Sequence, residues 1–150
     1  MKKLKVKRII LLIIALLLVG IQFFKIDRGN PVSDPHKDFI TITMPPQDVA
    51  TIIKGACYDC HSNETKYPVY SKIAPVSWMI KSHVTEAREH FNFSEWSSFD
   101  SAVQIHILKE CIEEIEKGGM PLKSYKMMHS SARMNDDERR LLIDWMKSIK

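Results

Sequence analysis

The sequence predicts an all-α domain preceded by a single N-terminal transmembrane helix. Residues 9–24 form an apolar run interrupted only by Gln22, with cations directly before and after it. Beyond residue 45, apolar side chains recur at the three- and four-residue spacing of helices. The short run at 39–42, Phe-Ile-Thr-Ile, is too brief to predict a sheet and is expected to pack on the domain surface.

The net charge of +4 is concentrated at the N-terminus. Residues 1–8 carry five Lys or Arg side chains and no acidic residue. Removing those five from the 22 Lys and Arg leaves 17 basic groups against 18 acidic ones in the rest of the chain. This near-neutral remainder has no basic-aromatic patch, which argues against a nucleic-acid partner.

The sequence predicts four parts: a basic cytoplasmic tail at 1–8, a transmembrane anchor at 9–24, a linker at 25–44 and the main domain at 45–150. The apolar run is slightly shorter than the roughly 20 residues of a full span, which also suits a signal peptide. No small-x-small cleavage site follows it, so an uncleaved anchor is favoured over a signal peptide or a buried core helix. Because basic flanks stay in the cytoplasm, the main domain is expected outside it.

Apolar spacing predicts a helix that starts near residue 46 and carries the segment 57–61 at its C-terminal end, and further helices near 75–91, 99–117 and 135–149, with 120–134 non-helical. Gly118 should end the third helix. Asn135 and Glu138 should form a capping box at the start of the last one. Cys111 lies in the apolar stripe of the third helix and is expected in the core. The inner face of the last helix is expected to contain Leu141, Leu142, Trp145 and Ile149.

The most informative motif is Cys57-Tyr58-Asp59-Cys60-His61. C-x-x-C-H is the attachment sequence of a c-type haem. Two thiols three residues apart face the same way on a helical turn, so each can form a thioether with one porphyrin vinyl group. His61 can then supply a nitrogen ligand to the iron. The alternatives are a zinc half-site, although no second Cys pair exists, and an unliganded or disulfide-linked pair.

Met120 is expected to bind the opposite side of the iron. Its thioether is a soft ligand that raises the reduction potential. Gly118 and Gly119 precede it and allow a close backbone approach, while Pro121 stiffens the loop. An open sixth position, suited to gas binding or peroxide chemistry, is the other possibility. The rival ligands are His129, Met127, Met128, Met134, His83 and His90.

Over about residues 40–150 the chain resembles the bacterial haem-binding domain family, which carries one c-type haem. The resemblance lies in the blocks CYDCHSNETKYPVYSKIAPVSWMIKSHVTEAREHFNFSEW and GGMPLKSYKMMHSSARMNDDERRLLIDWMK, with an N-terminus ending IQFFKIDRGNP. It implies a variant of the class I cytochrome c fold in which Cys57 and Cys60 attach the haem. His61 would be the proximal ligand and Met120 the distal one, and the helix with Trp145 would pack on the haem-bearing helix.

These features together predict a membrane-anchored electron-transfer protein rather than an enzyme, because the sequence shows no catalytic acid-base pair or nucleophile constellation. Covalent haem attachment needs reduced thiols and delivery of the chain across a membrane. The expected location is therefore the outer, periplasmic face of a bacterial cytoplasmic membrane. The expected partners are that membrane, the c-haem maturation machinery and redox proteins of unknown identity. A haem peroxidase or sensor with a labile sixth ligand is the alternative.

Overall fold

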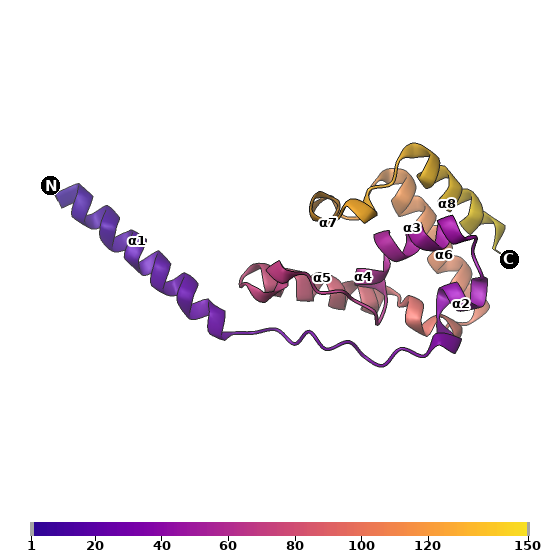
Figure 1. Cartoon of the computed structure of the whole chain (residues 1–150), viewed down its shortest axis with the longest axis horizontal. Coiled ribbons are helices and arrows are strands. Elements are labelled where there is room, and N and C mark those ends of the chain that lie inside the picture. Colours follow the sequence, from indigo (N-terminus) through magenta and orange to yellow (C-terminus); the bar gives the residue numbers. More distant parts are fainter. Residues whose placement is uncertain (1, 150) are drawn as a thin grey trace. The chain divides into compact units, whose positions relative to one another are not determined.

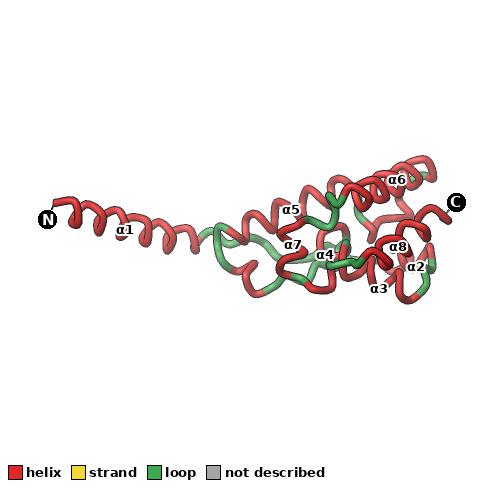
Figure 2. Tube along the Cα trace, turned by 90° about the horizontal axis from the view of Figure 1, so that it is seen from above, coloured by secondary structure: helices red, strands yellow, loops and turns green. Residues whose placement is uncertain are grey.

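A computed structural model describes residues 2–149, and every regular element among them is a helix (Figures 1 and 2). The all-α fold class is therefore confirmed. The chain divides into two units. One contains the residues through Gly29 together with Tyr67–His83, and the other contains Asn30–Lys66 and the residues from Val84 onward.

The first unit contains α1 (Lys2–Gly20), which continues into a 3-10 helix at Ile21–Phe23. Helix α1 begins within the basic tail because lysine is a good helix former, so the change in polarity does not end the helix. The segment Lys5–Phe23 is long and apolar enough to cross a membrane, with a mean hydropathy of 2.3, and a signal sequence shares both features. The rest of this unit holds the 3-10 helix Val69–Lys72 and the first part of α5 (Val76–His90).

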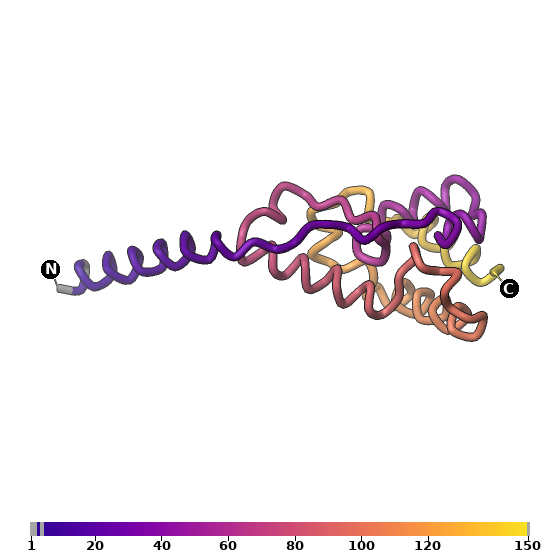
Figure 3. The backbone as a smooth tube through the Cα atoms, turned by 90° about the horizontal axis from the view of Figure 1, so that it is seen from below, coloured from indigo at the N-terminus to yellow at the C-terminus, as the bar shows by residue number. Residues whose placement is uncertain are grey.

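The second unit contains the remaining helices. They are α2 (Phe39–Thr43), α3 (Gln47–Ala56), α4 (Tyr58–His61), the end of α5, α6 (Ser101–Lys117), α7 (Lys123–Met128) and α8 (Asp136–Ser148), with 3-10 helices at Pro35–Lys37, Phe93–Ser98 and Ser130–Ala132. Helix α8 packs against both α3 and α6 (Figures 1 and 3). The long helices predicted from apolar spacing are therefore present.

Capping residues set several of the helix ends. The Asn135 side chain accepts the backbone N–H of Glu138, and the Glu138 carboxylate accepts that of Asn135, so the predicted capping box is confirmed. Asp100 caps α6 through the N–H of Val103. Gly118 ends α6 at a φ of 72°, a left-handed conformation that glycine adopts without a Cβ clash.

Two irregular segments differ from expectation. The stretch after Met120 contains α7 and a 3-10 helix, so the prediction of a non-helical segment there was wrong. Both helices are too short to show an apolar period, and spacing could not reveal them. Near the start of the second unit, Asp38 caps α2, and Phe39 is fully buried instead of packing on the surface.

Phe39 lies at the centre of the core of the second unit. The rings of Phe93, Trp96 and Trp145 lie 4.7, 4.6 and 5.8 Å from it, centroid to centroid. Cys111 packs against this cluster, where the sequence places it. The α8 residues buried in the core are Leu142, Ile143 and Met146, whereas Leu141 is exposed, so the expected inner face of α8 was wrong at position 141.

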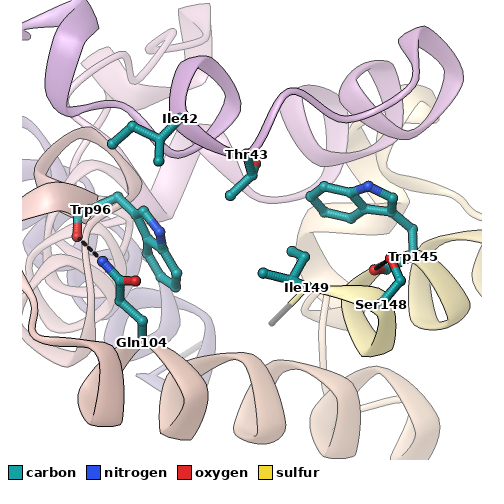
Figure 4. Close-up of a pocket in the computed structure, with 7 residues that line it drawn as sticks. All are labelled: Ile42, Thr43, Trp96, Gln104, Trp145, Ser148 and Ile149. Atoms are coloured by element: carbon teal, nitrogen blue, oxygen red, sulfur yellow. Dashed lines mark hydrogen bonds between the residues drawn. The ribbon is translucent and has the colours of Figure 1, made fainter.

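A pocket of about 330 Å³ lies beside this core (Figure 4). Its lining residues are Ile42, Thr43, Trp96, Gln104, Trp145, Ser148 and Ile149. The Gln104 side chain donates to the carbonyls of Trp96 and Phe99, and the Ser148 hydroxyl donates to the carbonyl of Trp145. The pocket thus shares no residue with the four that are predicted to hold haem.

Candidate haem-binding site

Cys57 joins α3 to α4. Its φ and ψ of −123° and −39° end α3, so the motif occupies a turn of its own after the helix. The expectation that a single helix carries the motif at its C-terminal end was therefore wrong. The backbone N–H groups of Cys60 and His61 both donate to the Cys57 carbonyl, at 3.1 and 2.9 Å. Both cysteines and the histidine therefore project from one closed turn, which is the local arrangement that the motif predicts.

The two thiols of this turn are neutral at physiological pH. Burial raises the pKa of Cys57 to about 12, with a smaller contribution from Cys60. Burial also raises the pKa of Cys60 to about 11, and Asp59 adds to the shift while Arg88 opposes it. Zinc is bound by thiolates and not by neutral thiols, and usually by a group of four ligands. Within the described residues, no group of three or more His, Cys, Asp or Glu is placed to hold a metal ion.

The third cysteine, Cys111 on α6, lies near the motif. Burial raises the pKa of its thiol, and the proximity of Cys57 raises it further. All three cysteines are free thiols. Neither Cys57 nor Cys60 is therefore held in a disulfide, as covalent attachment requires.

His61 is a neutral imidazole in an aromatic pocket. Its ring stacks on Phe91 with centroids 4.1 Å apart, and meets the edge of Phe93 at 6.5 Å. Nδ1 lies 3.4 Å from the Phe91 carbonyl oxygen, which can only accept, so the tautomer that makes this hydrogen bond has its hydrogen on Nδ1. Burial lowers the pKa of His61 to about 4, partly opposed by this hydrogen bond. Nε2 therefore keeps its lone pair, which is what an iron ligand needs.

Arg88 on α5 fixes the chain directly after the motif. Its Nε donates to the Ser62 carbonyl at 2.8 Å, and its Nη2 donates to Thr65 Oγ1 and Asn30 Oδ1 at 2.8 and 2.9 Å. The Thr65 hydroxyl donates in turn to the carbonyl of Asp59 at 2.7 Å. The Arg88 guanidinium group therefore fixes Ser62, directly after the turn, and Thr65 in the loop that follows, which is itself bonded to Asp59 in the turn.

The residues between the cysteines connect the turn to other elements. The Tyr58 hydroxyl lies 3.1 and 3.0 Å from the two carboxylate oxygens of buried Asp38, the residue that caps α2. Burial and the nearby Asp38 carboxylate raise the pKa of Tyr58 well above its usual range, so its hydroxyl remains a donor. Asp59 accepts the Lys66 N–H at 2.9 Å and the Tyr125 hydroxyl at 2.7 Å.

Met120 lies outside this turn, on the loop that follows α6. Its N–H and that of Gly119 both donate to the Glu114 carbonyl, at 3.2 and 2.9 Å. The paired glycines therefore close the end of α6, and the Met120 side chain remains 38% exposed.

The segment that follows Met120 contacts the motif. In addition to the bond from Tyr125 on α7 to Asp59, Gly55 on α3 lies directly against Ser131. A Cβ at Gly55 would stand only 2.8 Å from the Ser131 carbonyl oxygen. His129 stacks on Tyr125 with ring centroids 4.2 Å apart, so this rival ligand lies in the segment after Met120 that contacts the motif.

The other rival ligands have different surroundings. The ring of His90 pairs with Glu110 through Nε2, at 3.2 Å. Met134 packs against the core of the second unit, whereas Met127 and Met128 are exposed. These surroundings do not decide between the ligands, so Met120 stays the predicted sixth ligand, with His83 and the residues above as its rivals.

Sequence reasoning missed several residues that position the motif. Asp38 had a usable signal, because an aspartate before Phe-Ile-Thr-Ile is a good helix N-cap. Arg88 and Tyr125 have no such signal in the sequence, since their contacts depend on how distant segments pack. The Phe91 carbonyl is undetectable from sequence because every residue type carries one.

An all-helical unit that presents two thiols and a neutral imidazole from one turn has the features of a haem protein. The model of the haem-binding domain family matches residues 16–148. The chain therefore belongs to the haem-binding domain family, as its resemblance predicted, and haem is the cofactor that the family supports. The comparisons with curated proteins and with solved structures found no significant match.

The contact between Asp59 and Tyr125 should couple the motif to the segment after Met120. In a double-mutant cycle with Asp59→Asn and Tyr125→Phe, we expect a coupling energy of about 1–2 kcal/mol, because the hydroxyl donates to a partly buried carboxylate. Denaturant unfolding of the haem-loaded protein measures it. Asp144→Asn, an acid-to-amide change at an exposed α8 position, is the control and should not couple to Tyr125→Phe. Additive effects at Asp59 and Tyr125 would contradict the contact.

Proposed function

We propose that this haem protein carries one c-type haem, attached through thioethers to Cys57 and Cys60 and ligated by His61. The observation that supports it best is the closed turn, which presents both neutral thiols beside an imidazole whose Nδ1 is already engaged. The donor set fits the group: two S–H groups can add across two vinyl groups, and Nε2 can bind iron. The buried rings of Phe91 and Phe93 would shield the ligand side from water.

One-electron transfer is the proposed role, with Met120 as the sixth ligand. A bound haem would supply the redox change through its iron. The chain would hold the imidazole at a fixed tautomer through the Phe91 carbonyl and supply a soft thioether from the loop after α6. No catalytic acid or base is assigned, and redox proteins of unknown identity would be the donor and acceptor.

The proposed setting is the outer face of a bacterial cytoplasmic membrane. The length and composition of the Lys5–Phe23 segment support an anchor, and the basic residues before it support a cytoplasmic N-terminus. A chain maturing there would receive its haem from c-haem maturation proteins. The proposed architecture is a variant of the class I cytochrome c fold, in which α3 and α4 carry the haem and α8 packs on α3.

The test is a pyridine haemochrome assay and an absorption spectrum of the full chain produced with a c-haem maturation system. We expect one covalent haem per chain and a low-spin spectrum. Haem that is removed by acidic acetone would exclude the thioethers, and high-spin iron in both oxidation states would exclude a carrier with two strong axial ligands.

A second candidate function is a haem peroxidase or sensor with a displaceable sixth ligand. The observation that favours it is the partial exposure of the Met120 side chain, because an exposed ligand is more readily replaced. Rapid binding of carbon monoxide by the reduced protein would support this function over electron transfer.

Met120→Ala should leave the haem attached but change its spin state. We expect the reduction potential to fall by on the order of 100 mV, because axial ligands set haem potentials over a range of about 0.8 V. Potentiometric titration and the methionine-to-iron band of the oxidised form measure the change. Met44→Ala, at a position that is 80% exposed and is not among the rival ligands, is the matched control. If Met120→Ala has the parent spectrum, His129→Ala is the next variant to examine.

A further inference from the structure

The first unit exposes a group of apolar side chains close to the end of the candidate membrane segment. Val69 is 77% exposed and Ile73 56%, and Val76, Trp78 and Met79 are exposed as well. Val76 and Met79 stand three residues apart on α5 and so share one side of that helix. We refer to these five residues as the 69–79 face. Exposed apolar side chains that gather in one part of a fold mark contacts with a membrane or with another protein.

Hydrogen bonds join the 69–79 face to the end of the candidate membrane segment. The Gln22 side chain donates to the Ala74 carbonyl and accepts the Ala74 N–H, both at 3.0 Å. The indole N–H of Trp78 donates to the carbonyl of Phe24 at 2.9 Å. Gln22, the one polar residue of the apolar run, thus pairs fully with the backbone in the middle of this face.

The chemistry of these residues fits the boundary between lipid and water. Tryptophan is enriched at that boundary because its ring is apolar and its N–H is polar. Cationic side chains stand in the same unit at Lys25, Arg28 and Lys72, and all three are exposed. Such cations reach anionic headgroups while their alkyl stems lie along apolar surface. The combination favours a lipid surface as the partner.

We propose that the 69–79 face inserts into the interfacial layer of the membrane, so that the chain is held there by a second contact in addition to its N-terminal helix. The inference rests on the proposed anchor, because Gln22 and Phe24 bring the face to the membrane only if the segment before them spans it. The partner is a lipid bilayer with anionic headgroups.

Site-directed photo-crosslinking of the full, haem-loaded chain tests the proposal. The protein is reconstituted into vesicles of phosphatidylcholine and phosphatidylglycerol, with p-benzoylphenylalanine in place of Val69 or Ile73. The same group in place of Leu12, which is 64% exposed on α1, reports whether the anchor spans the membrane. In place of Ile105, 60% exposed on α6, it measures the background at an apolar position of similar exposure. Haem content shows that each variant is folded.

We expect lipid adducts at Val69 and Ile73 to approach the yield at Leu12 and to exceed that at Ile105 by about tenfold, since burial of one such side chain shifts an equilibrium at least this far. Labelling at Leu12 with only background at Val69 and Ile73 would overturn the inference and leave the anchor intact. Background at Leu12 as well would overturn both. Adducts between two chains at Val69, in place of lipid adducts, would assign the face to a second copy and overturn the inference.

Discussion

Replacing Cys57 and Cys60 together with alanine should abolish covalent haem attachment. Each thiol leaves the same closed turn and can react with only one vinyl group, so the two thioethers are lost separately. Each single variant should therefore keep one thioether and yield less matured protein, whereas the double variant should carry only haem that denaturation removes. Haem staining after denaturing electrophoresis and the intact mass of the chain measure the two states.

Cys111→Ala is the matched control for this experiment. Its thiol is buried close to Cys57 but lies on α6, outside the turn that carries the motif. We expect full covalent attachment in this variant. A Cys111→Ala chain that loses covalent haem, or a double variant that retains it, would show that the third thiol takes part in attachment.

Phe39→Ala should lower the free energy of unfolding by about 3–5 kcal/mol. The ring is fully buried and contacts three other aromatic rings at centroid distances from 4.6 to 5.8 Å. Its removal leaves a cavity lined by large rings that cannot readily collapse, and it forfeits the aromatic pair contacts as well. Denaturant unfolding of the haem-loaded protein measures the change.

Ile42→Ala provides the comparison, because Ile42 lies on the same short helix and is 40% exposed. Its loss of stability should stay below about 1 kcal/mol. Equal losses at Phe39 and Ile42 would mean that α2 as a whole, and not the buried ring, determines the contribution of this segment. Such a result would contradict the central role of the Phe39 ring in the core.

The sequence predicted the long helices because each carries an apolar stripe and a recognisable end. The capping box at Asn135 and Glu138 and the left-handed Gly118 are local features that need no tertiary information. Helix α2 and helix α7 escaped prediction because they are five and six residues long, less than two helical turns. Phe39 reads as part of a linker in the sequence, and only packing against residues far along the chain shows it to be central.

The features of the candidate site also divide into those that follow from the local sequence and those that depend on distant contacts. Two thiols and a histidine on one turn follow from the spacing of Cys57, Cys60 and His61 alone. The tautomer of His61 depends on the Phe91 carbonyl, thirty residues further on, and the position of the turn depends on Arg88. These are long-range contacts of backbone and side chain, which a single sequence does not encode in any local pattern.

Gly55 acts as a spacer between the motif helix and the chain beyond Met120. Because a methyl group there would already meet the Ser131 carbonyl at 2.8 Å, the size of residue 55 sets how closely the two segments can approach. Alanine at this position, or serine with one more atom, would push the two segments apart, and residue 55 is not one of the proposed ligands. The separation of the motif helix from the chain beyond Met120 can therefore be adjusted in steps of one atom without changing Cys57, Cys60, His61 or Met120.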